Sequence, residues 1–329
     1  MGEDELLGWL HRQIRTPGSD LDSIGDDTAI LPAESWAVTV DTQIEGVHFR
    51  PGLDPRRLAR RLLAVNLSDL AASGASPAYA FLVIAAPSSF DHRRFFRAFL
   101  QRAEPLGLRL AGGDLASQPT VHVSLTLLGR RRPRGRWLRR DDASAGHGLW
   151  LGGTVGESAA GCLLMAQGAT LEGRRVVLPA AFEGRPSLAR AARRAVRRHL
   201  EPEPQLDLGA WLAEAPEGGV IDLSDGLAKD LHRLCDASGV GAVLETRRLP
   251  LAPGARPLAQ ALGTDSLGLA LGGGEDYVLL FTLPDGMEPP DALGCRRVGR
   301  ITRGRSVQLL DDSGSLGPLE AQGWDHLER

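Results

Sequence analysis

The segment DPRRLARRLLAVNLSDLAASGASPAYAFLVIAA, residues 54–86, decides the fold class, because it reads as a helix that leads into a buried strand. Asp54 followed by Pro55 is typical of a helix start, with a capping carboxylate and a proline in the first turn. Apolar residues then recur at helical spacing to about Ser73. The apolar run from Ala78 to Ala86 has the length and composition of a buried strand. A helix followed directly by such a strand indicates mixed α/β architecture.

The same alternation of helix and strand extends in both directions from this segment. Before it we expect a helix from Glu3 to Ile14 and a strand from Trp36 to Asp41. After it we expect, in chain order, a helix at 91–106, strands at 108–112, 121–128 and 148–151, helices at 158–167 and 187–200, a strand at 219–223, a helix at 224–237 and a strand at 277–283. The order is mixed in both halves of the chain, which argues for two α/β or α+β domains.

A domain boundary is predicted near the middle of this series. Residues 130–140 hold seven arginines, a proline and a glycine, and no helical or strand periodicity. The length of 329 residues also suggests two domains. We therefore predict an N-terminal domain at 1–135 and a C-terminal domain at 136–329.

The basic residues exclude two classes of nucleotide enzyme. Lys229 is the only lysine, so 37 of the 38 basic residues are arginine. A P-loop needs G-x-x-x-x-G-K-[ST] and a protein kinase needs a strand lysine in a V-A-I-K setting, and Lys229 stands in neither pattern. No G-x-G-x-x-G fingerprint occurs either, which argues against a Rossmann dinucleotide site.

Composition also bears on partners and location. The net charge is −3 and the arginine-rich segments contain almost no interleaved aromatic residues, so we expect no nucleic-acid partner. The most apolar run is far shorter than the roughly 20 residues that span a bilayer, so we expect no membrane segment. The three cysteines form no C-x-x-C pair and the N-terminus shows no secretory pattern, which favours a cytoplasmic protein.

Five aspartate-containing segments stand beside glycine or other small residues. They lie at 25–27, 40–42, 67–70, 112–114 and 221–226. Any one of these aspartates could simply cap a turn or a helix. Asp69 is the most informative, because it lies inside an otherwise apolar helix where a lone buried carboxylate would be costly. Together the five segments indicate a shared acidic site.

An acidic site of this kind favours bound cations. Carboxylates that converge repel one another unless cations lie between them. Oxygen ligands from short side chains suit Mg²⁺, which keeps further positions for water and substrate phosphates. Glycine-rich segments at 111–114, 151–156 and 271–276 could present backbone N–H groups to phosphate, or could be no more than tight turns. No nucleophile elbow occurs, so the residues favour metal-assisted phosphoryl transfer without a covalent enzyme intermediate.

Taken together, these segments resemble the thiamine-monophosphate kinase family, whose members use ATP to convert thiamine monophosphate to thiamine diphosphate. The matching segments follow the family order at 24–29, 41–49, 64–72, 112–114, 221–227, 273–277 and 323–326. The family is similar to the aminoimidazole-ribonucleotide-synthetase-like group, which binds ATP without a P-loop. The resemblance implies an α/β (α+β) chain with an N-terminal mixed sheet or half-barrel and a C-terminal α/β sandwich. It also implies homodimers whose N-terminal domains form a shared barrel.

The resemblance further implies roles for individual residues. It assigns Mg²⁺ ligation to Asp27, Thr39, Val40, Asp41, Asp69, Asp114, Asp222 and Asp225. It assigns ATP contacts to Gly113, Asp114, Arg140 and Ser224. It assigns the thiamine phosphate to His48, Glu275 and Trp324. The residue types assigned to the thiamine phosphate are chemically reasonable, because an aromatic face and a carboxylate suit a cationic thiazolium ring and a histidine can reach a phosphate.

The chain departs from the family pattern at Val40, Leu115, His147 and Gln205. Val40 stands where a threonine is common, so a metal contact there has to use the backbone carbonyl. Leu115 also replaces a threonine, which removes one hydroxyl from the nucleotide region. None of these departures changes an aspartate of the acidic site.

The leading hypothesis is direct, in-line transfer of the ATP γ-phosphoryl group to thiamine monophosphate, assisted by Mg²⁺. One alternative is another ATP-using enzyme of the same structural group, such as a ribonucleotide amide ligase or a selenophosphate-forming enzyme. The latter would need a reactive cysteine near the N-terminus, and the first cysteine is Cys162. The other alternative is a non-catalytic protein that binds metal and nucleotide. ADP release that depends on thiamine monophosphate separates an enzyme from a binding protein.

Overall fold

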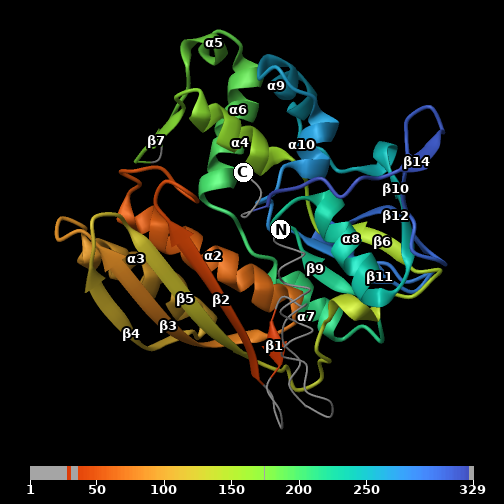
Figure 1. Cartoon of the computed structure of the whole chain (residues 1–329), viewed down its shortest axis with the longest axis horizontal. Coiled ribbons are helices and arrows are strands. Elements are labelled where there is room, and N and C mark those ends of the chain that lie inside the picture. The colour runs from red at the N-terminus through yellow and green to blue at the C-terminus, as the bar shows by residue number, and fades with distance from the viewer. Residues whose placement is uncertain (1–27, 31–35, 174, 326–329) are drawn as a thin grey trace.

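The computed structural model describes residues 28–30, 36–173 and 175–325. Within these ranges the strands form two large sheets and one two-stranded pair, and helices cover the sheets (Figure 1). The predicted helix from Glu3 to Ile14 and the predicted metal ligand Asp27 lie outside the described residues. The α/β class and the two-part organisation are confirmed, whereas a boundary at residue 135 stays a prediction.

The first sheet belongs to the N-terminal part of the chain. Its strand order is β1 (Ala29–Ile30), β2 (Trp36–Ile44), β5 (His122–Arg130), β3 (Ser76–Ala86) and β4 (Arg109–Ser117). Neighbouring strands are antiparallel except β3 and β4, which are parallel. Helices α2 (Pro55–Ala72) and α3 (His92–Ala103), the latter extended by the 3-10 turn η1 (Glu104–Leu106), share one apolar core with this sheet. They cover one face only.

Helix α2 begins as its sequence predicts. The Asp54 carboxylate caps it by accepting from the Arg56 backbone N–H, and Pro55 occupies the first helical position. The leucines at 58, 62, 63, 67 and 70 are all buried against the sheet. This burial, rather than helix propensity alone, is what stabilises the helix in place.

The second sheet belongs to the C-terminal part. Its strand order is β14 (Leu316–Pro318), β13 (Val307–Leu310), β10 (Gly241–Glu245), β12 (Arg296–Thr302), β6 (Gly148–Leu151), β11 (Leu279–Leu283) and β9 (Val220–Asp222). The helices of this part are α4 (Glu157–Ala166), α5 (Ala180–Glu183), α6 (Pro186–Leu200), α7 (Leu206–Ala213), α8 (Leu227–Ser238), α9 (Ala255–Ala261) and α10 (Ser266–Gly272). The two-stranded pair is β7 (Thr170–Glu172) with β8 (Arg175–Val177). The 3-10 turns are η2 (Arg140–Asp142), η3 (Thr246–Arg248) and η4 (Asp291–Leu293).

Alternation along the strands gives this sheet two buried faces. Leu149 and Leu151 of β6 share a core with α8 and α10, whereas Trp150 between them packs with α7 on the other face. Ala71 and Ala72, at the end of α2, belong to the same core as α7. Helix α2 therefore lies between the two sheets and contacts both (Figure 1).

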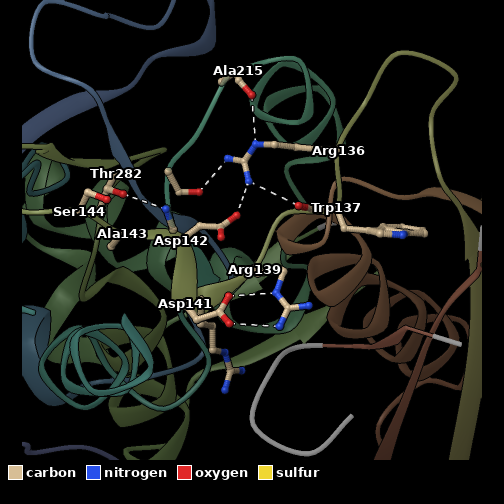
Figure 2. Close-up of polar contacts among 12 residues, drawn as sticks. Arg136, Trp137, Arg139, Asp141, Asp142, Ala143, Ser144, Ala215 and Thr282 are labelled. Atoms are coloured by element: carbon tan, nitrogen blue, oxygen red, sulfur yellow. Dashed lines mark hydrogen bonds and ion pairs between the residues drawn. The ribbon is translucent and has the colours of Figure 1, made fainter. Parts of the chain in front are cut away.

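The arginine-rich segment between the sheets is held by its own side chains. Arg136 donates from Nε to the Ala215 carbonyl at 3.0 Å and from Nη1 to the Asp142 carboxylate at 2.6 Å (Figure 2). Arg139 donates from Nε to Asp141 at 2.9 Å (Figure 2). Arg136 and Arg139 thus anchor the start of the C-terminal part.

Some predicted boundaries were wrong for identifiable reasons. The strand was expected to end at Gly112, with a glycine-rich turn after it, but Gly112 and Gly113 both lie inside β4, where the strand register shifts beside Phe81. Gly113 has φ +151°, and a Cβ there would lie 1.8 Å from the Leu82 carbonyl oxygen, so the strand needs glycine at this position. The helix expected from Ser224 begins at Leu227, because residues 224–226 form a turn that ends at Gly226 with φ +137°.

Among the described residues, no helix is both long and apolar enough to cross a membrane. The cytoplasmic location and the absence of a nucleic-acid partner stay predictions.

Candidate functional site

A cavity of about 1400 Å³ opens between the two parts of the chain. Nine of the residues singled out in the sequence line it: Asp41, His48, Asp69, Arg140, Asp222, Ser224, Asp225, Glu275 and Trp324. They come from both sheets, from α2, from the turn after β2, from η2, from the loops that follow β9 and α10, and from the segment after β14. Residues far apart in the sequence are therefore gathered around one space.

The first sheet and α2 provide one acidic wall. Alternate residues of β2, namely Thr39, Asp41 and Gln43, face α2. The Thr39 hydroxyl donates to the Asp69 carboxylate on α2, which fixes the predicted helix-borne carboxylate at the sheet. Asp69 is thus a side chain with a defined position and not a simple helix cap, as its place inside the apolar helix indicates.

The second sheet provides the facing acidic wall. Asp222 is the last residue of β9 and is buried, and Asp225 follows in the turn before α8. Burial, and then repulsion from Asp225, raise the pKa of Asp41 to about 7. This repulsion means that carboxylates from the two walls lie close enough to interact, which is what a cation between them would relieve.

Basic side chains stand beside the second acidic wall. Arg233 of α8 donates to the Asp225 carboxylate at 2.6 Å and to Asp230 at 3.1 Å. Lys229 lies 3.9 Å from Asp225 and donates to the Trp324 carbonyl at 2.6 Å. The only lysine of the chain therefore holds the C-terminal segment at the site instead of forming a P-loop.

The same cavity is also lined by the residues predicted to bind the thiamine moiety. The Glu275 carboxylate contacts the guanidinium of Arg61 and lies 3.3 Å from His199 Nδ1. The Trp324 side chain is 51% exposed, and its backbone N–H donates to the Asp225 carbonyl at 2.9 Å. A carboxylate and an open aromatic face thus line one cavity, a combination that suits an organic cation.

His48 is oriented by the turn that follows β2. Its Nδ1 accepts from the Ile44 backbone N–H at 3.0 Å. Because Nδ1 is the acceptor, the proton of the neutral ring lies on Nε2, which leaves an N–H donor suited to a phosphate oxygen.

Several predicted residues do not line the cavity. Gly113 and Asp114 lie on the exposed edge strand β4. Val40 is 62% exposed, because it points to the face of the first sheet that α2 and α3 leave open. Thr39 acts on the site through Asp69. Within the described ranges, no three His, Cys, Asp or Glu side chains are gathered tightly enough to hold a metal ion by themselves. Mg²⁺ does not require such a cage, because it commonly binds through one or two carboxylates together with water and phosphate oxygens.

Arg61 was not predicted from the sequence, although it lines the cavity wall and contacts Glu275. A signal was available, since Arg61 is a charged residue on the apolar face of α2, the same criterion that singled out Asp69. Gln43 and His199 were missed as well, and they have no comparable local signal.

The chain is similar to several known proteins. Residues 25–131 match the family model described as AIR synthase related protein, N-terminal domain. The chain is 35% identical over 291 residues to thiamine-monophosphate kinase of Salmonella typhimurium, covering 86% of this chain and 83% of that protein. It is 30% identical over 347 residues to the protein of that name from Haemophilus influenzae, covering 100% of this chain and 98% of that protein. A solved structure of AaThiL complexed with AMPPCP and TMP superposes with a TM-score of 0.82 at 28% identity, covering 99% of this chain and 97% of that one.

The environment of His199 predicts an unusual titration. Burial, and then the charge of Arg61, lower the pKa of His199 to about 4. We expect the NMR resonances of its ring, assigned by comparison with His199→Gln, to keep the chemical shift of the neutral imidazole down to about pH 5. The unfolded chain binds this proton near pH 6.5, so lowering the pH favours unfolding. Between about pH 7 and 5 the wild type should lose about 2 kcal/mol of unfolding free energy relative to His199→Gln. Titration of the folded protein near pH 6.5 would contradict this expectation.

Proposed function

This chain belongs to the thiamine-monophosphate kinase family, and on that basis we propose that it uses ATP to phosphorylate thiamine monophosphate to thiamine diphosphate. One observation carries the proposal: a single cavity is lined by acidic side chains from both sheets and also by the Glu275 carboxylate and the open aromatic side chain of Trp324. Such a space can hold a metal-bound triphosphate and a cationic phosphate ester side by side. The relative AaThiL, solved with AMPPCP and TMP, supports the same pair of ligands.

The residues present fit Mg²⁺. The acidic walls offer oxygen donors from short side chains, namely Asp41, Asp69, Asp222 and Asp225, and the raised pKa of Asp41 reflects charge that a cation would offset. When bound, Mg²⁺ neutralises charge between the donor and acceptor phosphates, which otherwise repel each other.

Side chains of the protein provide the other contacts with the two substrates. Arg140 and Ser224 line the cavity and can donate to phosphate oxygens of ATP. In the same cavity, Glu275 and Trp324 hold the thiazolium ring, and His48 donates from Nε2 to the acceptor phosphate. The acceptor is already an anion, so orientation matters more than removal of a proton. We therefore propose direct, in-line transfer.

The described residues offer little support for a covalent enzyme intermediate. Cys162 is a cysteine that lines the cavity, and burial raises the pKa of its thiol. A protonated thiol is a poor nucleophile. Direct transfer between the two substrates is the simpler chemistry for this site.

Asp69→Asn tests the proposed role of the acidic wall. The variant keeps the size of the side chain and removes its charge, so we expect the wild type to form thiamine diphosphate and the variant to lose about a hundredfold or more in kcat. Asp207→Asn, an exposed carboxylate on α7, is the matched control and should retain wild-type turnover. Product is followed by chromatography with Mg²⁺-ATP and thiamine monophosphate.

Undiminished turnover in Asp69→Asn, or no product from the wild type, would overturn the proposal. ADP release without thiamine diphosphate would favour the ligase-like alternative, and ligand uptake without turnover would favour a binding protein.

We also propose a homodimer that forms through the N-terminal sheet. Val40 and Phe81 stand in one row across the strands, because each pairs in register with Thr126, and both are exposed together with Val83. The adjacent strand β4 is an exposed edge. Among the described strands none pairs with the outer side of β4, and an open apolar face beside such an edge suits a second copy of the sheet. Gly113 and Asp114 lie on this edge, and their contacts with ATP and metal stay predictions.

Val83→Glu tests the dimer. A buried unpaired carboxylate at the centre of the proposed interface should shift the protein from dimer to monomer in light scattering at micromolar concentration. Leu316→Glu, at an exposed leucine on β14 of the other sheet, is the control and should leave the mass unchanged. A wild-type monomer, or a Val83→Glu dimer, would contradict the interface.

A further inference from the structure

Arg61 is a buried cation at the junction between the two parts of the chain. Its side chain is 1% exposed although it lies in the middle of α2. Nε donates to Gln43 Oε1 of β2 at 3.0 Å. One terminal nitrogen donates to the backbone carbonyl of His199, at the end of α6, and the other donates to Glu275 Oε1. A single guanidinium therefore ties three elements together around the cavity.

The backbone around Glu275 is already held in place without Arg61. The Glu275 N–H donates to the Ser224 carbonyl at 2.6 Å. The neighbouring Asp276 carboxylate accepts from the backbone N–H groups of Gly156 at 2.6 Å and Ser158 at 3.1 Å. Glu275 has φ +56°, a left-handed conformation that is uncommon for residues other than glycine. What remains to be fixed is the direction of the Glu275 side chain.

The contact with Arg61 fixes that direction, because Arg61 donates to Oε1. His199 Nδ1 lies 3.3 Å from Oε2, but its ring is neutral and Nδ1 also lies 3.2 Å from the Ser158 hydroxyl. Four other arginines line the same cavity, and two of them, Arg50 and Arg57, could attract this carboxylate elsewhere if it were released. A carboxylate that pairs with them would no longer face a ligand in its present position.

We propose that Arg61 is a positioning residue for the cationic part of the substrate: it holds the Glu275 carboxylate where the thiazolium ring binds. This inference rests on the proposed function. The geometry requires arginine, because three nitrogens of one planar group donate in three directions, whereas lysine has one compact ammonium group. Arg61 itself need not touch the substrate.

The test compares three single variants by steady-state kinetics with each substrate varied in turn. Arg61→Met should raise the KM for thiamine monophosphate about tenfold to a hundredfold, and change the KM for ATP by less than about threefold. Arg61→Lys keeps the charge and should recover part of the loss. Arg60→Met removes the exposed neighbouring arginine on the same helix and should match the wild type. An equal rise in both KM values, or an unchanged KM for thiamine monophosphate, would overturn the proposal.

A double-mutant cycle separates positioning from general support of the fold. If Arg61 acts through Glu275, then Arg61→Met should add little to the KM change that Glu275→Gln already causes. If instead the KM changes of the two single variants multiply in the double variant, Arg61 only supports the fold. Should Arg61→Met fail to fold, judged by thermal melting, the same cycle is run with Arg61→Lys. If the wild type binds thiamine monophosphate but produces no thiamine diphosphate, the proposed function fails on its own, and dissociation constants from calorimetry complete the Arg61 comparison.

Discussion

The site depends on the cost of placing charge inside helix α2. Arg61 and Asp69 lie on a helix that is packed between two sheets, where an unpaired charge would be expensive. Each therefore has a partner in β2: Gln43 accepts from Arg61, and Thr39 donates to Asp69. These contacts lock the helix to the first sheet in one register. They also hold both charged side chains at the wall of the cavity, and the rest of the site is arranged around that helix.

The carboxylates that line the cavity have different electrostatic surroundings. Carboxylates of the two acidic walls oppose each other, and burial together with the charge of Asp225 raises the pKa of Asp41. The carboxylate of Glu275 is matched instead by Arg61, and the neighbouring imidazole of His199 is kept neutral by burial. The first environment favours cations that carry phosphates, and the second favours one organic cation held in a fixed place. This division is the physical basis for joining two phosphorylated ligands in one cavity.

Local signals explain what the sequence could predict. Helix α2 and strand β3 have strong periodicity and a clear cap, so their type and position followed from the residues alone. Asp69 was identified because a lone buried carboxylate inside an apolar helix would be costly. Strands β10, β12 and β13 were not predicted, because their order in the sheet depends on pairings between distant segments. The contact of Arg61 with Glu275 joins residues 214 positions apart and has no local signature. The glycine pair of β4 looks like a turn locally, and only the close approach of the Leu82 carbonyl shows why the strand needs it.

The central claim is that both substrates occupy one cavity together and react directly. The measurement that addresses it is the stereochemical course of transfer from ATP made chiral with oxygen isotopes at its γ-phosphorus. A single in-line displacement between the two bound substrates inverts the configuration at phosphorus in the thiamine diphosphate formed. Inversion is the predicted result. Retention would require two displacements and a phosphorylated enzyme group, and would contradict the account.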